Sequence, residues 1–187
     1  MIDFLYQKKT RRFQIVVEKI ETLCLKRFSK SVFNQKTNRE KEIEAKKNLI
    51  QLMHPKSNLI HDIYGAPKLS NGKAFSLSHS KKLLAVISAN KLASIDIEPI
   101  SQKAFRVRSK FLSNREQNLA KNNEMATLMW CAKECLYKIH KTGGINLKEN
   151  LSIKNIFKNK LECYLLDKEY TLNYEKIKEH WLVYYFD

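Results

Sequence analysis

Residues 93–100, ASIDIEPI, set two carboxylates into a stretch that is otherwise typical of a buried β-strand. Side chains alternate between the two faces of a strand, so Asp96 and Glu98 share one face while Ile95 and Ile97 share the other. We therefore expect the isoleucines to point into a core and the carboxylates to lie together on the opposite face.

Two carboxylates at this spacing repel each other unless a cation lies between them. Carboxylate oxygens are the ligands that Mg²⁺ prefers, and one or two of them suffice where water and substrate phosphates complete its shell. Asp96 and Glu98 thus predict half of a site for a phosphate-bound magnesium ion. The alternative is an edge strand that carries two solvated charges.

Two further strand-like runs precede this stretch, at residues 75–80 and 83–89. Short connections of hairpin length separate the three runs, which predicts an antiparallel meander. Pro99 ends the third strand because proline cannot donate to a ladder of hydrogen bonds.

Residues 124–144, EMATLMWCAKECLYKIHKTGG, form the longest predicted helix, which its final glycines stop. One stripe of this helix carries Trp130, Glu134, Lys138 and Lys141, opposite an apolar stripe. A third carboxylate with a lysine one turn further on suits a metal-bound, doubly charged substrate. The alternative is an ordinary Glu–Lys helix pair worth about 0.2–0.5 kcal/mol.

Composition narrows the class of protein. The chain has 187 residues, 43% of them hydrophobic, and a formal net charge of +16, which indicates a folded domain with polyanionic partners.

No apolar run is long enough to span a membrane and no signal peptide is recognisable, so we expect a cytoplasmic protein without membrane contact. The four cysteines lack a C-x-x-C pair and are expected to be reduced thiols. The order of helices and strands favours the α+β class.

The two carboxylate motifs together resemble the paired signature of the Sfp-type 4′-phosphopantetheinyl transferase family. SIDIE at residues 94–98 resembles G-[IV]-D-[IV]-E, and WCAKECLYK at residues 130–138 resembles [FW]-[SCT]-x-K-E-[AS]-x-x-K. Four other segments are similar to family motifs and follow the family order, namely NREKEIEAKKNLI, YGAPKL, AFSLSHS and SKFLSNREQNL. The resemblance covers about residues 38–145, with Ser94 in place of the usual glycine.

The resemblance implies the fold and the reaction of that family. The fold consists of two similar α+β halves related by a pseudo-twofold axis, here roughly residues 1–100 and 101–187 of one domain, and the chain is expected to be a monomer. The reaction moves the 4′-phosphopantetheine arm of coenzyme A to a serine of an apo carrier protein, with magnesium as cofactor, and releases adenosine 3′,5′-bisphosphate. Such carriers are usually acidic, which gives the basic charge of the chain a use.

The resemblance also implies roles for individual residues. Asp96, Glu98 and Glu134 would hold the magnesium ion, and Glu134 would accept the serine proton. Lys138 would offset charge on the pyrophosphate, which makes Glu134, Asp96 and Lys138 the expected catalytic set. Separately, the charge of the segment after the strand predicts a landing surface for the acidic carrier, made by Lys103, Arg106, Arg108, Lys110 and Arg115, and the alternative is an ordinary solvated charged face.

Contacts to the phosphates of coenzyme A are expected from residues upstream. His79 would meet the 3′-phosphate together with Ser78 and Arg39. Ala66 stands where the family usually has a phosphate-binding lysine, and Lys68 is the candidate to replace it. Lys30 and Lys36 match only by neighbourhood.

Two other classes of protein remain as alternatives. A nucleic-acid-binding module would use the positive charge, but the chain contains no recognisable nucleic-acid-binding motif. A metal-dependent nuclease would use three acids and a lysine, but such sites usually place E-x-K on a strand, whereas this E-x-x-x-K is predicted on a helix. Nucleic acid is therefore not the expected partner.

Overall fold

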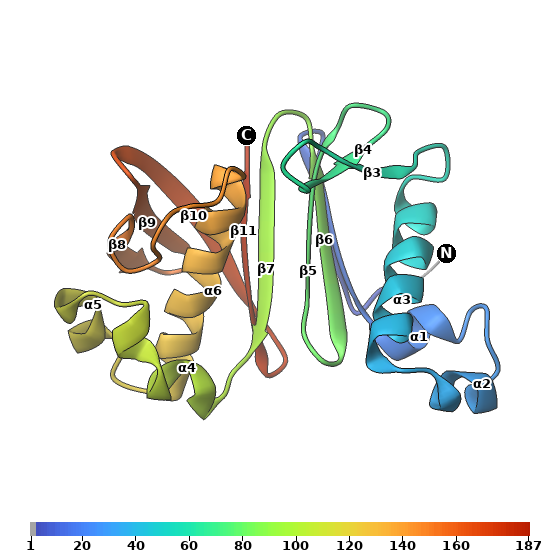
Figure 1. Ribbon diagram of the computed structural model, residues 1–187, viewed down its shortest axis with the longest axis horizontal. Helices are drawn as coiled ribbons and strands as arrows, with labels where there is room; N and C mark the ends of the chain where they lie inside the picture. The colour runs from blue at the N-terminus through green and yellow to red at the C-terminus, as the bar shows by residue number, and fades with distance from the viewer. Residues whose placement is uncertain (1–2) are drawn as a thin grey trace.

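The computed structural model describes residues 3–187 as two antiparallel β-sheets stacked face to face, with one long helix on each outer face (Figure 1). The first sheet has the order β1–β2–β6–β5, with the bounds β1 Tyr6–Lys9, β2 Phe13–Lys19, β5 Ala74–His79 and β6 Leu83–Ala89. The second has the order β7–β11–β10–β9–β8, with the bounds β7 Ala93–Pro99, β8 Leu151–Phe157, β9 Lys160–Leu165, β10 Lys168–Ile177 and β11 His180–Phe186. A separate hairpin consists of β3 Leu59–His61 and β4 Pro67–Leu69.

The helices are α1 Ile20–Cys24, α2 Lys30–Gln35, α3 Asn38–Met53, α4 Gln102–Arg106, α5 Asn114–Leu119 and α6 Asn123–His140, with a 3₁₀ turn η1 at Arg108–Lys110. Helix α3 covers the first sheet and α6 covers the second (Figure 1). The α+β class predicted from the sequence is confirmed, and the arrangement of one sheet and one long helix on each side agrees with the 4′-phosphopantetheinyl transferase fold.

Strand β7 departs from the predicted meander. Strands β5 and β6 pair antiparallel as expected, but β7 pairs with β11 at the edge of the second sheet. The prediction was wrong for this third strand because hairpin spacing does not fix the partner of the returning strand. Crossing to the second sheet buries both faces of β7, one against the first sheet and one against α6. The two sheets therefore divide the chain between β6 and β7, ahead of the boundary expected at residue 100.

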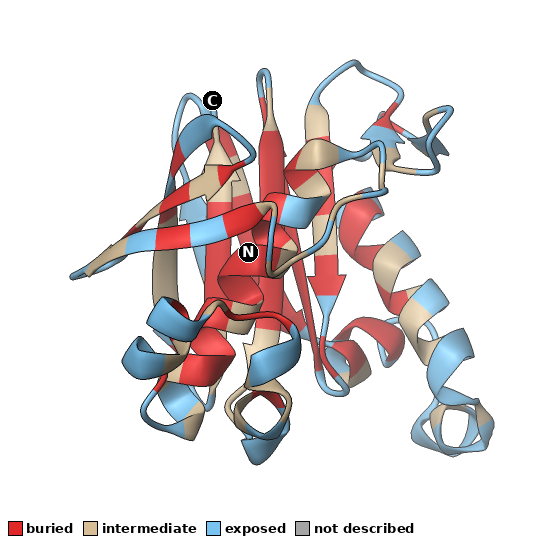
Figure 2. Ribbon diagram, turned by 60° about the vertical axis from the view of Figure 1, so that its left-hand side comes forward, coloured by how far each residue is buried: buried red, intermediate tan, exposed pale blue. Residues whose placement is uncertain are grey.

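Apolar side chains from both sheets fill the space between them. Ile15 and Ile87 of the first sheet pack with Ile95, Ile97 and Leu182 of the second, and all five are fully buried. Figure 2 shows buried residues running along the central strands, while exposed residues lie on the outer sides of the helices and in the loops. Burying a side chain of this size contributes about 1.5–3 kcal/mol, so this layer is what holds the two sheets together.

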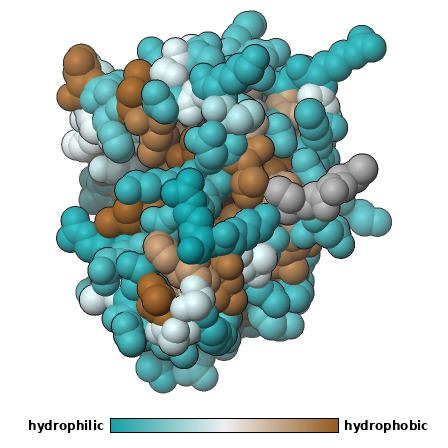
Figure 3. Space-filling view, turned by 90° about the vertical axis from the view of Figure 1, so that its right-hand side faces the viewer, coloured by the Kyte–Doolittle hydropathy of each residue, from teal (hydrophilic) through white to brown (hydrophobic). Residues whose placement is uncertain are grey.

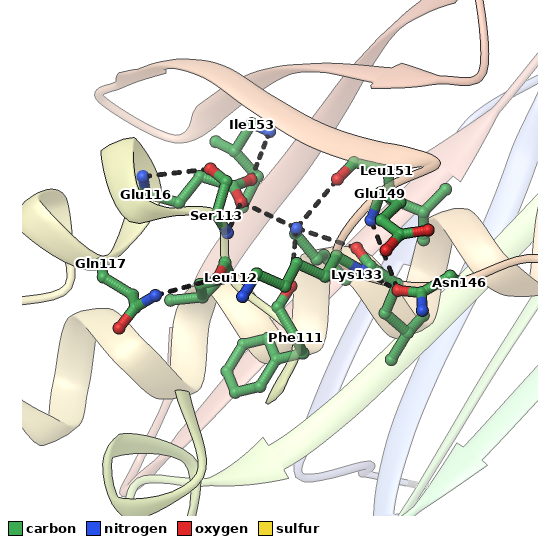
Figure 4. Close-up of polar contacts among 12 residues, drawn as sticks. Phe111, Leu112, Ser113, Glu116, Gln117, Lys133, Asn146, Glu149, Leu151 and Ile153 are labelled. Carbon is green, nitrogen blue, oxygen red and sulfur yellow. Dashed lines mark hydrogen bonds and ion pairs between the residues drawn. The ribbon is translucent and has the colours of Figure 1, made fainter. Parts of the chain in front are cut away.

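Helix α6 begins and is anchored through polar contacts. The Asn122 side chain accepts the Met125 N–H over 2.8 Å, as an N-cap residue does. Further along, Lys133 is fully buried and its ammonium group donates to Oε2 of Glu116 over 2.9 Å and to three backbone carbonyls, those of Phe111, Leu147 and Leu151. Figure 4 shows Glu116 and Lys133 pointing toward each other between these segments. The pair ties α6 to α5 and to the start of β8.

Two further features of the structure concern the cysteines and the length of the helices. All four cysteines are buried and free of disulfides. Within residues 3–187, no helix combines the length and the apolar character that crossing a bilayer requires.

Candidate active site

Strand β7 and helix α6 bring together four side chains that the sequence predicts to carry the chemistry. Asp96 and Glu98 lie on the face of β7 that packs against α6, and Glu134 and Lys138 come from α6 itself. We call these four residues the acid–lysine cluster. The predicted alternation along β7 is confirmed, since Ile95 and Ile97 face the core between the sheets.

Asp96 is the most buried carboxylate of the cluster, with 3% of its surface exposed. Its Oδ1 accepts a hydrogen bond from the Ser78 hydroxyl and one from the Lys138 ammonium, each over 2.7 Å. Its Oδ2 is buried and has no hydrogen-bond partner within the described part of the chain. The nearby Cys131 thiol donates instead to the Trp181 carbonyl over 3.6 Å. Asp96 therefore has one oxygen in use and one free.

The other two carboxylates carry charge that their surroundings disfavour. Burial raises the pKa of Glu98, and the Asp96 and Glu134 charges add to this, while a hydrogen bond from Trp130 Nε1 over 3.1 Å opposes it. Burial and then the Asp96 charge raise the pKa of Glu134, with partial compensation from Lys138. The cluster thus combines three carboxyl groups with one ammonium group, in surroundings that disfavour the charged form of two of the carboxyl groups.

Lys138 is held in place by Asp96 and by the backbone. Its ammonium group donates to the Ile95 carbonyl over 2.9 Å as well as to Asp96. Burial alone would lower the pKa of Lys138, but the charge of Asp96 and the hydrogen bond to it raise the pKa overall. The expected contact of Lys138 with a pyrophosphate therefore competes with these two contacts.

The donor set of the cluster fits magnesium in its chemistry. Three carboxyl groups provide hard oxygen ligands beside a single lysine, and among the described residues Oδ2 of Asp96 is buried without a partner. In the arrangement that residues 3–187 adopt, however, no group of three His, Cys, Asp or Glu side chains is preassembled to hold a metal ion. Binding an ion therefore requires the side chains of the cluster to move toward one another.

A cavity of about 880 Å³ lies beside the cluster, where the ends of the two sheets meet α3. We call it the junction cavity. Its size is within the range of small-molecule sites, roughly 300–1,000 Å³. Its charged and polar lining consists of Lys19, Glu21, Asn38, Lys41, Glu42, His79, Ser80, Lys81, Lys82, Glu98, Lys178, Glu179 and His180. Glu98 thus belongs both to the acid–lysine cluster and to this cavity, so a ligand in the cavity lies next to the carboxylates.

The three residues expected at the 3′-phosphate are not brought together. His79 lines the junction cavity with its Nε2 3.4 Å from Oε2 of Glu42, and burial followed by the Lys46 charge lowers its pKa. Ser78, the preceding residue on β5, faces Asp96 instead. Arg39 is exposed in the first turn of α3 and is not among the residues that line the junction cavity. Of the three, only His79 therefore faces this cavity.

A second cavity of about 680 Å³ lies between α3 and the β3–β4 hairpin. It combines the cations Arg27, Lys46 and Lys47 with apolar side chains such as Ile43 and Leu59. Figure 3 looks onto the side of the molecule where α3 lies and shows hydrophobic side chains exposed among hydrophilic ones. Lys68, the expected substitute for the missing lysine, is exposed on β4 and lines neither of these two cavities.

Three residues near the site are not predicted from the sequence to take part in it. Trp130 supports Glu98 through its indole N–H, and its place on the same helical stripe as Glu134 was a usable signal. His180, at the start of β11, lines the junction cavity and contacts the Ser80 hydroxyl over 3.2 Å. Lys133 anchors α6 as described above. No local pattern distinguishes His180. Lys133 is the lysine that precedes Glu134 in the motif at residues 130–138, but the motif does not reveal its buried partners, which come from distant segments.

Comparison with known families agrees with this site. Residues 94–185 match the family model described as the 4′-phosphopantetheinyl transferase superfamily. The matched segment contains Asp96, Glu98, Glu134 and Lys138, all of the acid–lysine cluster. This match confirms the 4′-phosphopantetheinyl transferase superfamily, and the Sfp type within it stays a prediction. No curated protein matches the chain significantly.

Proposed function

We propose that this chain, which belongs to the 4′-phosphopantetheinyl transferase superfamily through residues 94–185, is an Sfp-type enzyme that uses coenzyme A as its donor. It transfers the 4′-phosphopantetheine arm to a serine of an apo carrier protein, requires magnesium and releases adenosine 3′,5′-bisphosphate. The observation that carries the proposal is the position of the acid–lysine cluster, which shares Glu98 with a cavity of about 880 Å³ that His79 also lines.

The chemistry follows from the groups in the cluster. Asp96, Glu98 and Glu134 would hold the magnesium ion, whose charge would neutralise the negative charge of the pyrophosphate during transfer. Glu134 would accept the proton of the carrier serine while the serine oxygen attacks the phosphorus next to pantetheine. The bond from that phosphorus to the oxygen of the bisphosphate breaks, and the bisphosphate leaves. Because burial raises the pKa of Glu134, its carboxylate is a stronger base than that of an exposed glutamate.

The surroundings of the cluster supply the proposed contacts to both substrates. Lysines 41, 81 and 82 and His79 line the junction cavity and are suited to the phosphates of coenzyme A. The segment that follows β7 exposes Lys103, Arg106 and Lys110, which are suited to an acidic carrier. Both sheets and the whole cluster come from one chain, which supports a monomer. Four cysteines without disulfides support a cytoplasmic location.

The proposal is tested by incubating the protein with coenzyme A, Mg²⁺ and a purified apo carrier. Mass spectrometry of the carrier should show the addition of one phosphopantetheine arm. The same carrier with its acceptor serine changed to alanine should remain unmodified. The unchanged carrier should also remain unmodified when EDTA replaces Mg²⁺. Apo carriers from fatty acid, polyketide and peptide synthesis should be compared, because the site leaves the pathway open.

Asp96→Ala is the matched control on the enzyme. Loss of the Asp96 carboxylate should abolish transfer, while the far-UV circular dichroism spectrum should stay that of the folded protein. Absence of transfer to all three kinds of carrier, or equal transfer by wild type and Asp96→Ala, contradicts the proposal. Cleavage of DNA or RNA in the presence of Mg²⁺ would instead identify a nuclease.

A further inference from the structure

Ser78 joins the two sheets at the acid–lysine cluster. Its hydroxyl, on β5 of the first sheet, donates to Oδ1 of Asp96, on β7 of the second, over 2.7 Å. Both residues are buried, with 8% of Ser78 and 3% of Asp96 exposed. Lys138 donates to the same oxygen, so Oδ1 has two donors while Oδ2 has no partner within residues 3–187.

The proton of the Ser78 hydroxyl is already in use. A serine hydroxyl has one proton to donate, and an ionised phosphate oxygen can only accept. While Ser78 donates to Asp96, it therefore has nothing to offer a phosphate. The bond to a carboxylate is charge-assisted and roughly twice as strong as one between neutral groups. His79 faces the junction cavity and contacts Glu42, so the two neighbouring residues point in different directions.

We propose that Ser78 is a positioning residue for Asp96 and not a ligand of a coenzyme phosphate. Ser78 and Lys138 both donate to Oδ1 of Asp96, which fixes the plane of this carboxylate. Oδ2 is then the one oxygen of Asp96 that is left to bind a divalent cation. The inference rests on the proposed function, because that cation is the magnesium ion proposed above. Ser78 acts through Asp96 and across the boundary between the two sheets.

Ser76 provides a matched control for the test. It lies two residues earlier on β5, is also buried, and its hydroxyl oxygen accepts the Ile95 N–H over 3.2 Å. Ser76→Ala therefore removes a hydrogen bond between the same two strands without touching the carboxylate. Ser78→Thr keeps a hydroxyl at the position and serves as the conservative variant.

The experiment measures binding and does not depend on turnover. Mn²⁺ is the probe, with free Mn²⁺ followed by electron paramagnetic resonance in the presence of coenzyme A. Wild type, Ser78→Ala, Ser78→Thr and Ser76→Ala are compared, and thermal unfolding establishes that each is folded. A second measurement determines, without metal, the ratio of affinities for coenzyme A and dephospho-coenzyme A.

Ser78→Ala should weaken Mn²⁺ binding by about 10- to 100-fold, the usual effect of removing a partner that orients a metal ligand. Ser78→Thr and Ser76→Ala should stay close to wild type, and Ser78→Ala should keep the wild-type preference for coenzyme A over dephospho-coenzyme A. If Ser78→Ala does not fold, Ser78→Cys, which donates only weakly, carries the same expectation.

Three results would overturn the inference, and they separate it from the proposed function. Wild-type Mn²⁺ affinity in Ser78→Ala overturns the positioning role alone. Loss of the preference for coenzyme A in Ser78→Ala returns Ser78 to the 3′-phosphate. A wild-type protein that binds no Mn²⁺ overturns both this inference and the magnesium requirement of the proposed function.

Discussion

Replacing Lys133 by methionine tests what holds helix α6 in place. Methionine is similar in length but has no donor, so the buried ammonium group is lost, and with it the three N–H groups that four acceptors share. Removing one partner of a buried ion pair costs about 3–5 kcal/mol. Three backbone carbonyls also lose this donor, whereas Glu116 keeps the N–H groups of Ser113 and Ile153, each over 2.8 Å. We expect the free energy of unfolding to fall by about 3–5 kcal/mol, out of roughly 5–15 for a typical domain.

The assay is urea unfolding followed by far-UV circular dichroism, with the free energy extrapolated linearly to water. Lys121→Met is the control, because Lys121 is exposed just before the same helix and should change stability by no more than about 0.5 kcal/mol. The double variant with Glu116→Gln should recover part of the loss, because it no longer buries an unpaired charge. A loss below about 1 kcal/mol for Lys133→Met would refute the anchoring role.

The remaining predictions concern the proposed chemistry and its pH dependence. Glu134→Gln should lower turnover by about 10²–10⁴-fold, the usual effect of losing a positioned base, and near-normal turnover in the carrier assay would remove Glu134 from the mechanism. Dephospho-coenzyme A should bind more weakly than coenzyme A by about 1.5–3 kcal/mol, and His79→Ala should erase much of that difference in a calorimetric titration. The pKa of Glu134 is raised in the folded protein, so protonation of its carboxyl group stabilises the folded state at low pH. This contribution to the free energy of unfolding is lost as the pH rises through the pKa of Glu134 in the folded protein. Metal-free Glu134→Gln should therefore melt at a higher temperature than wild type near pH 7, with the gap closing in acid; a gap independent of pH would show that the charge is not the cause.

The sequence was sufficient where a local period decides the structure. The alternation in residues 93–100 correctly divides Asp96 and Glu98 from Ile95 and Ile97, because both faces of β7 are buried and a shift of one residue would exchange them. Ser113 and Glu116, three residues apart in the sequence, form a capping box at the start of α5. The family, too, could be recognised from motifs that lie within continuous segments, and residues 94–185 bear this out.

Only the tertiary structure decided which side chains meet. Hairpin spacing suggested that β7 would pair with β6, yet packing against α6 and β11 made it the edge of the other sheet. That crossing is what brings Asp96 next to Ser78, and it redirects a hydroxyl that the motif alone would assign to a phosphate. A lysine is ordinarily expected in solvent, so the burial of Lys133 depends on carbonyls and a carboxylate that three other segments supply. Periodicity within one element fixes which face a residue occupies, but its partners are set by long-range packing, which no local pattern encodes.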